Sequence, residues 1–297
     1  MTDTLAIVVT YNRREKLEKN LGALLSQTAP ADILVVDNAS TDGTEETVRA
    51  LVSDRLFYVN TGANLGGAGG FSFGIREGYR RGYAAFWIMD DDCIPEKDAL
   101  EKLLEADASL TGPYGFLSGV AYFTDGSLCN MNVQKTGLKE KVTDYVSPTV
   151  PVIMATFVSL YFKRAVVREF GLPIKEFFIW SDDLEYTRRL SRRLPCYMVP
   201  SSRVTHEMKS NEKVNIASDS PDRLSRYECL YRNEVYVYRR EGFRGWTYLI
   251  SRMFLHSARI LFKGKSGRWK KLKTVWKSFF RGFSFRPAVE FAEESDG

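Results

Sequence analysis

Apolar runs and segments of helical periodicity alternate along the first half of the chain. The runs are short and rich in Val, Ile, Leu and aromatic residues, which is typical of buried strands. The expected strands lie at 5–10, 33–38, 56–60 and 84–89, and the expected helices between them at 13–27, 41–52 and about 70–81. This order predicts an α/β fold whose parallel strands are joined by right-handed crossovers and whose ligands bind at the carboxyl ends of the strands.

The second half follows a different pattern. Within 110–200, short strands that contain GVAYF, VIMATFVSLYF and CYMVP surround a helix that reads DDLEYTRRLSRR. Ser181 or Asp182 can cap this helix, and acidic residues in its first turn suit the helix dipole. From about Leu224 onward the pattern is helical and increasingly basic.

Three consecutive aspartates follow the apolar run at 84–89, in FWIMDDDCIP. Adjacent carboxylates repel one another and are costly to desolvate without a positive partner. On an extended segment Asp90 and Asp92 point to one side and Asp91 to the other, so the first two can share a hard cation such as Mg²⁺ or Mn²⁺. The alternative is a solvated loop whose acids cap the helix that follows.

Composition and charge limit the class of protein and the partners that the chain can have. The chain has 297 residues, 44% of them hydrophobic, which is enough for a sizeable core. Its formal charge is +5, but 239–286 holds fourteen Lys or Arg and one acid, so the rest of the chain is net acidic. The basic segment can meet phosphates, anionic lipid or nucleic acid. Four scattered cysteines and an N-terminus unlike a signal peptide predict reduced thiols and a cytosolic protein.

The segment 244–262 has apolar residues at helical spacing, interrupted by Arg252, His256 and Arg259. These charges argue against a transmembrane helix. An amphipathic helix followed by KGKSGRWKKLKTVWK predicts peripheral attachment to the inner face of the cell membrane. The alternative is a helix that packs on the catalytic body with its basic face in water. We therefore expect a catalytic domain at 1–222 and a basic helical region at 223–297.

Five motifs occur in order along the chain: IVVTYNR, ILVVDNASTDGT, NLGGAGGFSFGIREG, WIMDDDCIP and FFIWSDDLEYTRRL. Over roughly residues 4–240 this set resembles the inverting glycosyltransferases of the GT-A type, family 2. The resemblance implies a Rossmann-like nucleotide-binding α/β/α sandwich with a mixed sheet. NLGGAGGF combined with DDD is most similar to galactofuranosyltransferases, which use UDP-galactofuranose.

The resemblance also implies a set of donor and metal residues. The donor nucleotide site is expected at Thr10, Asp37, Asn64, Asp90 and Asp91. A carboxylate such as Asp37 accepts hydrogen bonds from an imide or a ribose, although it can equally cap the turn after its strand. Gly67 belongs to a glycine-rich stretch that lets the backbone approach the nucleotide sugar. Asp90, Asp92 and His206 are the expected ligands of Mn²⁺ or Mg²⁺.

The WSDDLEY motif supplies the expected catalytic residues. Inverting transfer needs a base that removes the acceptor hydroxyl proton, and Asp183 matches the family's base. Asp182 matches its neighbour, which contacts sugar hydroxyls. Trp180 can stack on an acceptor sugar or lie in the core. The structural alternative is that both aspartates merely cap a helix.

The sequence therefore predicts a metal-dependent glycosyltransferase with a UDP-sugar donor and a glycan or lipid-linked glycan acceptor. The chain is shorter than some galactan-polymerising relatives, which favours the addition of one or a few sugars. A dTDP-rhamnosyltransferase is the alternative within the same fold. Outside the enzyme class, the alternative is a nucleotide-sugar or nucleic-acid binding module, although we expect no nucleic-acid partner.

Overall fold

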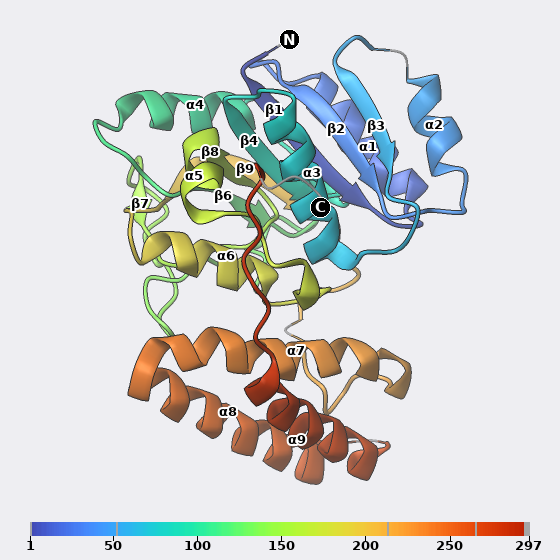
Figure 1. The fold of residues 1–297 in the computed structure, drawn as a ribbon, viewed down its shortest axis with the longest axis vertical. Coiled ribbons are helices and arrows are strands. Elements are labelled where there is room, and N and C mark those ends of the chain that lie inside the picture. The colour runs from blue at the N-terminus through green and yellow to red at the C-terminus, as the bar shows by residue number, and fades with distance from the viewer. Residues whose placement is uncertain (1, 52, 213, 265, 294–297) are drawn as a thin grey trace.

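A computed structural model describes residues 2–51, 53–212, 214–264 and 266–293. In these residues nine strands form one mixed sheet, in the order β3-β2-β1-β4-β8-β6-β9-β5, with β7 paired to β9 (Figure 1). The strands of the first half are β1 (Thr4–Thr10), β2 (Asp32–Asp37), β3 (Leu56–Asn60), β4 (Ala85–Asp90) and β5 (Cys93–Pro95). Those of the second half are β6 (Leu117–Tyr122), β7 (Val150–Pro151), β8 (Leu160–Lys163) and β9 (Tyr197–His206). The expected α/β fold with a mixed sheet is confirmed.

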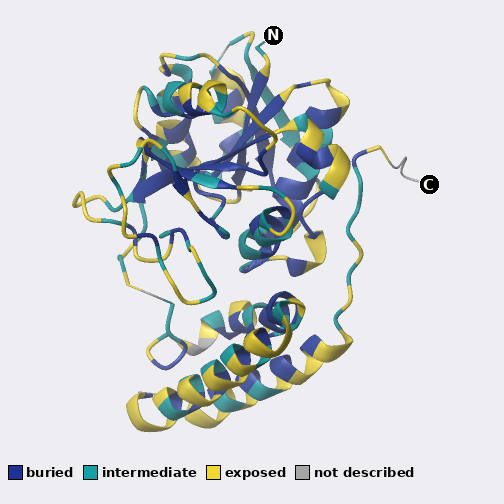
Figure 2. Cartoon of the chain, turned by 90° about the vertical axis from the view of Figure 1, so that its left-hand side faces the viewer, coloured by how far each residue is buried: buried dark blue, intermediate teal, exposed yellow. Residues whose placement is uncertain are grey.

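Helices cover both faces of this sheet, so its central strands are buried, whereas the edge strand β3 is only partly buried (Figure 2). One layer holds α1 (Arg14–Leu25), α2 (Thr44–Ala50) and α4 (Ala99–Ser109), and the other α3 (Gly66–Arg80), α5 (Arg164–Phe170) and α6 (Asp182–Ser191). The parallel pairing of β1 with β2 and β4 follows from the helices that connect these strands. Parallel strands covered on both sides read as continuous apolar runs, which is why the sequence revealed them.

The second half departs from the sequence prediction in one place. The run VIMATFVSLYF was expected to be a strand, but only its end forms β8, and α5 follows directly. Upstream of β8 the chain is irregular and is held by side chains: the Thr187 hydroxyl contacts the backbone of Ala155. A buried apolar run does not itself distinguish a strand from an irregular segment.

Three helices form a separate layer below the sheet (Figure 1). They are α7 (Leu224–Tyr238), α8 (Gly242–Lys263) and α9 (Arg268–Ser284), and they share an apolar core that includes Tyr231, Leu249 and Val275. The chain then returns to the sheet domain, where the Leu172 amide donates to the Glu290 carbonyl at 2.8 Å. In the described residues no helix combines the length and apolar character that a bilayer span requires.

Glycines set how closely α3 packs against the sheet. Gly70, Gly74 and Gly78 recur every four residues and so share one face of the helix. A Cβ on Gly74 would lie 2.6 Å from Ile7 and 2.8 Å from Val36, and added Cβ atoms on the other two would be equally close to β1 side chains. The glycine-rich sequence therefore has a packing role in addition to any role at the site.

We expect Gly74→Ala to lower the free energy of unfolding by about 1–3 kcal/mol, because the new methyl group overpacks the interface with β1 and β2. Gly22 is a matched control, since it lies within α1 and no atom lies within 4 Å of its Cβ position. Gly22→Ala should be neutral or stabilise by up to about 1 kcal/mol through helix propensity. Urea unfolding measures both, and equal effects at the two positions would contradict this account.

Candidate active site

The ends of three neighbouring strands place polar residues along one edge of the sheet. Thr10, the last residue of β1, pairs in register with Asp37 at the end of β2. On the other side of β1, Val9 pairs with Asp90 at the end of β4. The carboxyl ends of parallel strands are where α/β proteins bind ligands, so this edge is the candidate site.

The three consecutive aspartates divide between two sets of partners. Asp91 is buried and accepts hydrogen bonds from the Thr10 hydroxyl at 2.8 Å and from Arg13 at 3.2 Å. Asp92 accepts from Arg13 at 2.7 Å and lies 3.0 Å from Nε2 of His206. Asp91 and Asp92 lie in a turn after β4 and share Arg13, so the expected strand alternation does not continue through them.

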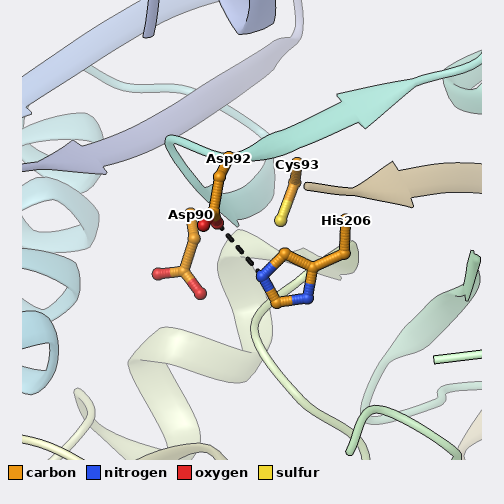
Figure 3. Close-up of side chains that lie close together, drawn as sticks. All are labelled: Asp90, Asp92, Cys93 and His206. Atoms are coloured by element: carbon orange, nitrogen blue, oxygen red, sulfur yellow. Dashed lines mark hydrogen bonds and ion pairs between the residues drawn. The ribbon is translucent and has the colours of Figure 1, made fainter. Parts of the chain in front are cut away.

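Asp90, Asp92, Cys93 and His206 each place one ligand atom within 4.8 Å of the others (Figure 3). Burial and the charge of Asp92 raise the pKa of Asp90 to about 8. Burial opposes ionisation of Asp92 as well, but His206, Arg13 and Lys16 lower its pKa to about 2. Two carboxylates and an imidazole are the donor set of a hard or borderline divalent cation. The Cys93 thiol, whose pKa burial raises, is not a donor that such a cation prefers.

The orientation of His206 favours a cation at this place. Its Nδ1 lies 3.0 Å from the Asn132 side-chain oxygen, which only accepts hydrogen bonds, so Nδ1 carries a proton. Nε2 faces the Asp92 carboxylate, which also only accepts. A cation bound between Nε2 and the Asp92 carboxylate satisfies both of them. A His that donates a hydrogen bond through one ring nitrogen and binds the cation through the other is the usual arrangement of a metal ligand.

Arg13 and Lys16 were not among the residues expected at the site. Arg13 precedes α1, and burial by itself would lower its pKa, but the charges of Asp91, Asp92 and Asp90 raise it. The Nζ atom of Lys16 lies 3.4 Å from Asp92. The signal in the sequence was the basic pair in TYNRR directly after the first strand. Asn132 lies in an irregular segment without any such signal.

The residues expected at the nucleotide line the same edge but have structural partners. Both oxygens of the fully buried Asp37 are engaged, one by the Tyr58 hydroxyl at 2.7 Å and one by the Ser40 amide at 2.9 Å. The turn-capping alternative is therefore observed, and a nucleotide contact of Asp37 stays a prediction. The Asn64 side chain accepts from the Gly66 amide at 2.9 Å, while the Cβ position of Gly67 faces open space.

Gly66 brings the start of α3 against the loop that leads into α6. Its φ of 72° and the nearby Phe178 carbonyl, with which a Cβ would collide, both require glycine. The Phe178 carbonyl accepts from the Ala68 amide at 3.2 Å. Phe178, Trp180 and Ser181 all have left-handed φ angles between 63° and 68°. Such residues cost about 1–3 kcal/mol each and are frequent at functional sites.

This loop carries Asp182 and Asp183 to the start of α6. Asp182 is buried, whereas Asp183 is partly exposed and can meet a substrate. Burial raises the pKa of both carboxyls, and the charge of Asp183 raises that of Asp182 further. The pKa of Asp183 rises only to about 6, because the Leu184 amide and Lys135 stabilise its ionised form. Of the two expected caps, Ser181 occupies the N-cap position of α6, but within the described residues its side chain makes no capping hydrogen bond.

Trp180 and His256 both contact side chains of α7. Trp180 is half-buried and packs edge-on against Tyr227 of α7, with ring centroids 5.2 Å apart, so the core alternative holds for part of its ring. His256, which lies in the amphipathic segment 244–262, shares a hydrogen bond of 2.8 Å with the Tyr231 hydroxyl on α7. The 132–135 segment lies near both His206 and Asp183. Asn132 contacts His206, and the charge of Lys135 favours the ionised form of Asp183.

The family model "Glycosyl transferase family 2" matches residues 5–163, more than half of the chain. The chain belongs to this family. Among curated relatives, galactofuranosyltransferase GlfT1 of Mycobacterium tuberculosis H37Rv is 28% identical over 287 residues, which cover 85% of this chain and 91% of the relative. The protein of the same name from Mycolicibacterium smegmatis is 29% identical over 285 residues and covers 86% and 92%. This protein is thus a family 2 glycosyltransferase similar to galactofuranosyltransferases.

Solved structures support the fold of this glycosyltransferase. GalNAc-T7 in complex with UDP, GalNAc and Mn²⁺ superposes with a TM-score of 0.64 at 14% identity over 95% of this chain, which spans 56% of that protein. The mannosyltransferase PcManGT of Pyrobaculum calidifontis, in complex with GDP-Man and Mn²⁺, superposes with a TM-score of 0.53 at 16% identity and covers 96% and 76%. At these identities the likeness shows the GT-A fold alone.

Lys135 should set the acid limb of the glycosyltransferase's pH–rate profile. If Asp183 acts as carboxylate, activity falls as the pH drops through its pKa. Lys135→Met removes a positive charge that favours the ionised form, so the limb should move to higher pH by roughly 0.5–1 unit. The exposed Lys139 is a matched control, and Lys139→Met should leave the limb in place. A limb that stays fixed or moves to lower pH in Lys135→Met would contradict this role.

Proposed function

We propose that this glycosyltransferase transfers galactofuranose from UDP-galactofuranose, with inversion, to a hydroxyl of a lipid-linked or cell-surface glycan. The donor is supported by the GlfT1 relatives, which match most of this chain. The observation that carries the mechanism is the presence of two distinct carboxylate sites at one end of the sheet. One is the Asp90, Asp92 and His206 cluster, and the other is the partly exposed Asp183.

Asp90, Asp92 and His206 would hold Mn²⁺ or Mg²⁺, whose positive charge stabilises a leaving nucleoside diphosphate. Arg13 already carries a positive charge at this place, 2.7 Å from Asp92 and 3.2 Å from Asp91. Its guanidinium can donate to a diphosphate while it stays near these carboxylates. Asp91 orients Arg13 and Thr10, so its contribution to the donor site is indirect.

Asp183 acts as the general base. Its carboxylate takes the proton of the acceptor hydroxyl as that oxygen bonds to the anomeric carbon, and the bond from that carbon to the diphosphate breaks with its electrons on the leaving oxygen. Asp182 is the neighbour that meets a sugar hydroxyl, and the exposed part of Trp180 offers an apolar face to a sugar ring. Thr10, Asp37, Asn64 and Gly67 define the nucleotide end of the site.

Release of UDP by the purified protein with Mn²⁺ and a membrane lipid extract tests this proposal. We expect release from UDP-galactofuranose and none from UDP-galactopyranose or dTDP-rhamnose. Asp183→Asn should lower turnover by about 10²–10⁴-fold while donor binding persists, because the amide cannot accept the proton. His206→Ala should raise the Mn²⁺ concentration needed for half-maximal activity, and chelation should abolish release.

The outcomes of the UDP-release experiment distinguish the galactofuranosyltransferase from the rhamnosyltransferase and the binding module. Transfer from dTDP-rhamnose with the same dependence on Asp183 would replace the donor but keep the mechanism. Near-normal turnover in Asp183→Asn would reject the base. Donor binding without turnover by any form of the protein would favour a binding module.

We also propose that α8 and α9 attach the protein to the inner face of an anionic membrane, with 1–222 as catalytic domain and 223–297 as helical region. The sequence contains no Asp or Glu between 242 and 289. Large apolar side chains are nevertheless exposed on both helices: Phe243, Phe254, Phe262, Trp269 and Phe280. Exposed apolar residues beside cations are what binding to an anionic lipid surface requires.

An apolar hollow lies between the same two helices. It has a volume of about 460 Å³ and is lined by Trp246, Ile250, Met253, Phe254, Trp276, Phe279 and Phe283. Phe254 is 61% exposed and Trp276 packs against it with ring centroids 5.6 Å apart. Figure 2 shows that long exposed stretches follow both helices on the side away from the sheet. The face formed by α8 and α9 therefore offers an apolar hollow as well as positively charged side chains.

Vesicle co-sedimentation tests the attachment. Binding to vesicles with anionic lipid should fall as salt rises, because exposed charges are screened. The double variant Lys273→Glu, Lys277→Glu should bind several-fold less. The matched control is Lys97→Glu, Arg193→Glu, which reverses two exposed charges on the catalytic body and should bind as the parent does. Equal sedimentation of both variants, or of the parent on neutral lipid at all salts, would argue against this interface.

A further inference from the structure

The loop before α6 has a backbone conformation that its own sequence does not favour. Phe178, Trp180 and Ser181 have φ angles of 63°, 64° and 68°, a region that L-residues with a large side chain rarely adopt. Asp182 and Asp183 follow directly. A conformation of this kind persists only when the surrounding structure holds it, so the groups that hold this loop also determine where Asp183 lies.

One side chain of α7 contacts most of this loop. Asn233 is fully buried, and its Nδ2 donates to the carbonyls of Phe177 at 3.0 Å and Trp180 at 2.9 Å, with a longer contact to Ile179 at 3.3 Å. Buried carbonyls need such partners, because an unmet hydrogen bond is costly away from water. The Phe177 carbonyl also accepts from the Ile179 amide at 2.7 Å, whereas the Trp180 carbonyl depends on Asn233. The two N–H groups of a single amide therefore hold both ends of the loop.

Arg232 fixes which way the Asn233 amide points. Its Nε and Nη2 donate to Oδ1 of Asn233 at 3.0 and 2.9 Å, and Nη2 also reaches the Glu176 carbonyl at 2.7 Å. A guanidinium only donates, so the oxygen of Asn233 must face Arg232 and the NH₂ group must face the loop. The donor and acceptor roles of the surrounding groups therefore determine the orientation of the Asn233 amide.

The opposite side of the loop rests on the glycine-rich start of α3. The Ala68 amide donates to the Phe178 carbonyl at 3.2 Å, and Gly66 leaves room for that carbonyl. The loop therefore lies between the expected donor site on one side and α7 on the other. The Phe178 carbonyl faces α3, whereas the carbonyls of Phe177, Ile179 and Trp180 face Asn233.

We propose that Asn233 is a positioning residue for the general base: it holds the 177–181 loop so that Asp183 faces the acceptor hydroxyl. Asn233 touches no reacting atom and acts through the loop. This inference rests on the proposed function of Asp183. A base must lie within about 2.6–3.2 Å of the proton that it removes, so a small displacement of the loop lowers turnover more than it weakens donor binding.

The test compares Asn233→Asp with the wild type. This variant keeps the shape of the side chain but replaces the donating NH₂ with an oxygen that faces three carbonyls. We expect kcat to fall by about 10- to 100-fold, with KM for the donor within about twofold. Hydrogen–deuterium exchange of the 176–185 backbone amides should become faster. The full-length protein is used throughout, and Asn233→Ala provides a second variant without the added negative charge.

Gln27 is the matched control. It is also a buried amide that holds backbone, since its Nε2 donates to the Glu96 carbonyl at 2.8 Å and its Oε1 accepts from the Leu100 amide at 3.1 Å. Gln27→Glu should cost stability without changing kcat or exchange in 176–185. A merely structural role of Asn233 predicts that both variants lose active protein to the same extent and keep the kcat of the folded fraction.

Three results would overturn the proposal: an unchanged kcat in Asn233→Asp, a loss shared with Gln27→Glu, or unchanged exchange in 176–185. If the wild type turns over none of UDP-galactofuranose, UDP-galactopyranose and dTDP-rhamnose, the proposed function is wrong whatever the role of Asn233. The exchange measurement still decides in that case whether Asn233 holds the loop.

Discussion

Repulsion between carboxylates at one end of the sheet is the constraint on which the rest of this structure depends. Asp90, Asp91 and Asp92 lie together where β4 ends, and Asp182 and Asp183 begin α6. Three of these groups have stabilising partners: Thr10 and Arg13 for Asp91, His206 and Arg13 for Asp92, and the Leu184 amide and Lys135 for Asp183. For Asp90 and Asp182, burial and a neighbouring carboxylate raise the pKa to about 8.

This distribution of charge separates two chemical tasks. The Asp90 and Asp92 side suits a cation and therefore a diphosphate. On the other side, burial raises the pKa of the partly exposed Asp183 to about 6, and the proposed role of general base requires a carboxyl of this kind. The 132–135 segment connects the two, because Asn132 contacts His206 and Lys135 acts on Asp183.

The C-terminal helices contact the loop before α6 directly. Asn233 on α7 contacts the loop before Asp183, and Trp180 from that loop packs on Tyr227 of α7. The chain after α9 returns to the sheet domain, where Glu290 forms ion pairs with Arg76 and Lys175. Through the apolar core that they share with α7, α8 and α9 are therefore linked to the loop that precedes Asp183.

The sequence by itself determined the features that depend on local pattern. Strand and helix periodicity gave the parallel half of the sheet, and the motifs identified the family, because buried parallel strands and loops at their ends carry a strong local signal. Tertiary structure alone decided which groups meet across long separations. Asn132, Lys135 and Asn233 lie in segments without a motif. Only after folding does Asn132 contact His206, the charge of Lys135 act on Asp183, and Asn233 contact the 177–181 loop. The irregular start of the VIMATFVSLYF run and the contact of Asp37 with Tyr58 likewise depend on residues that are distant in the sequence, which no local pattern contains.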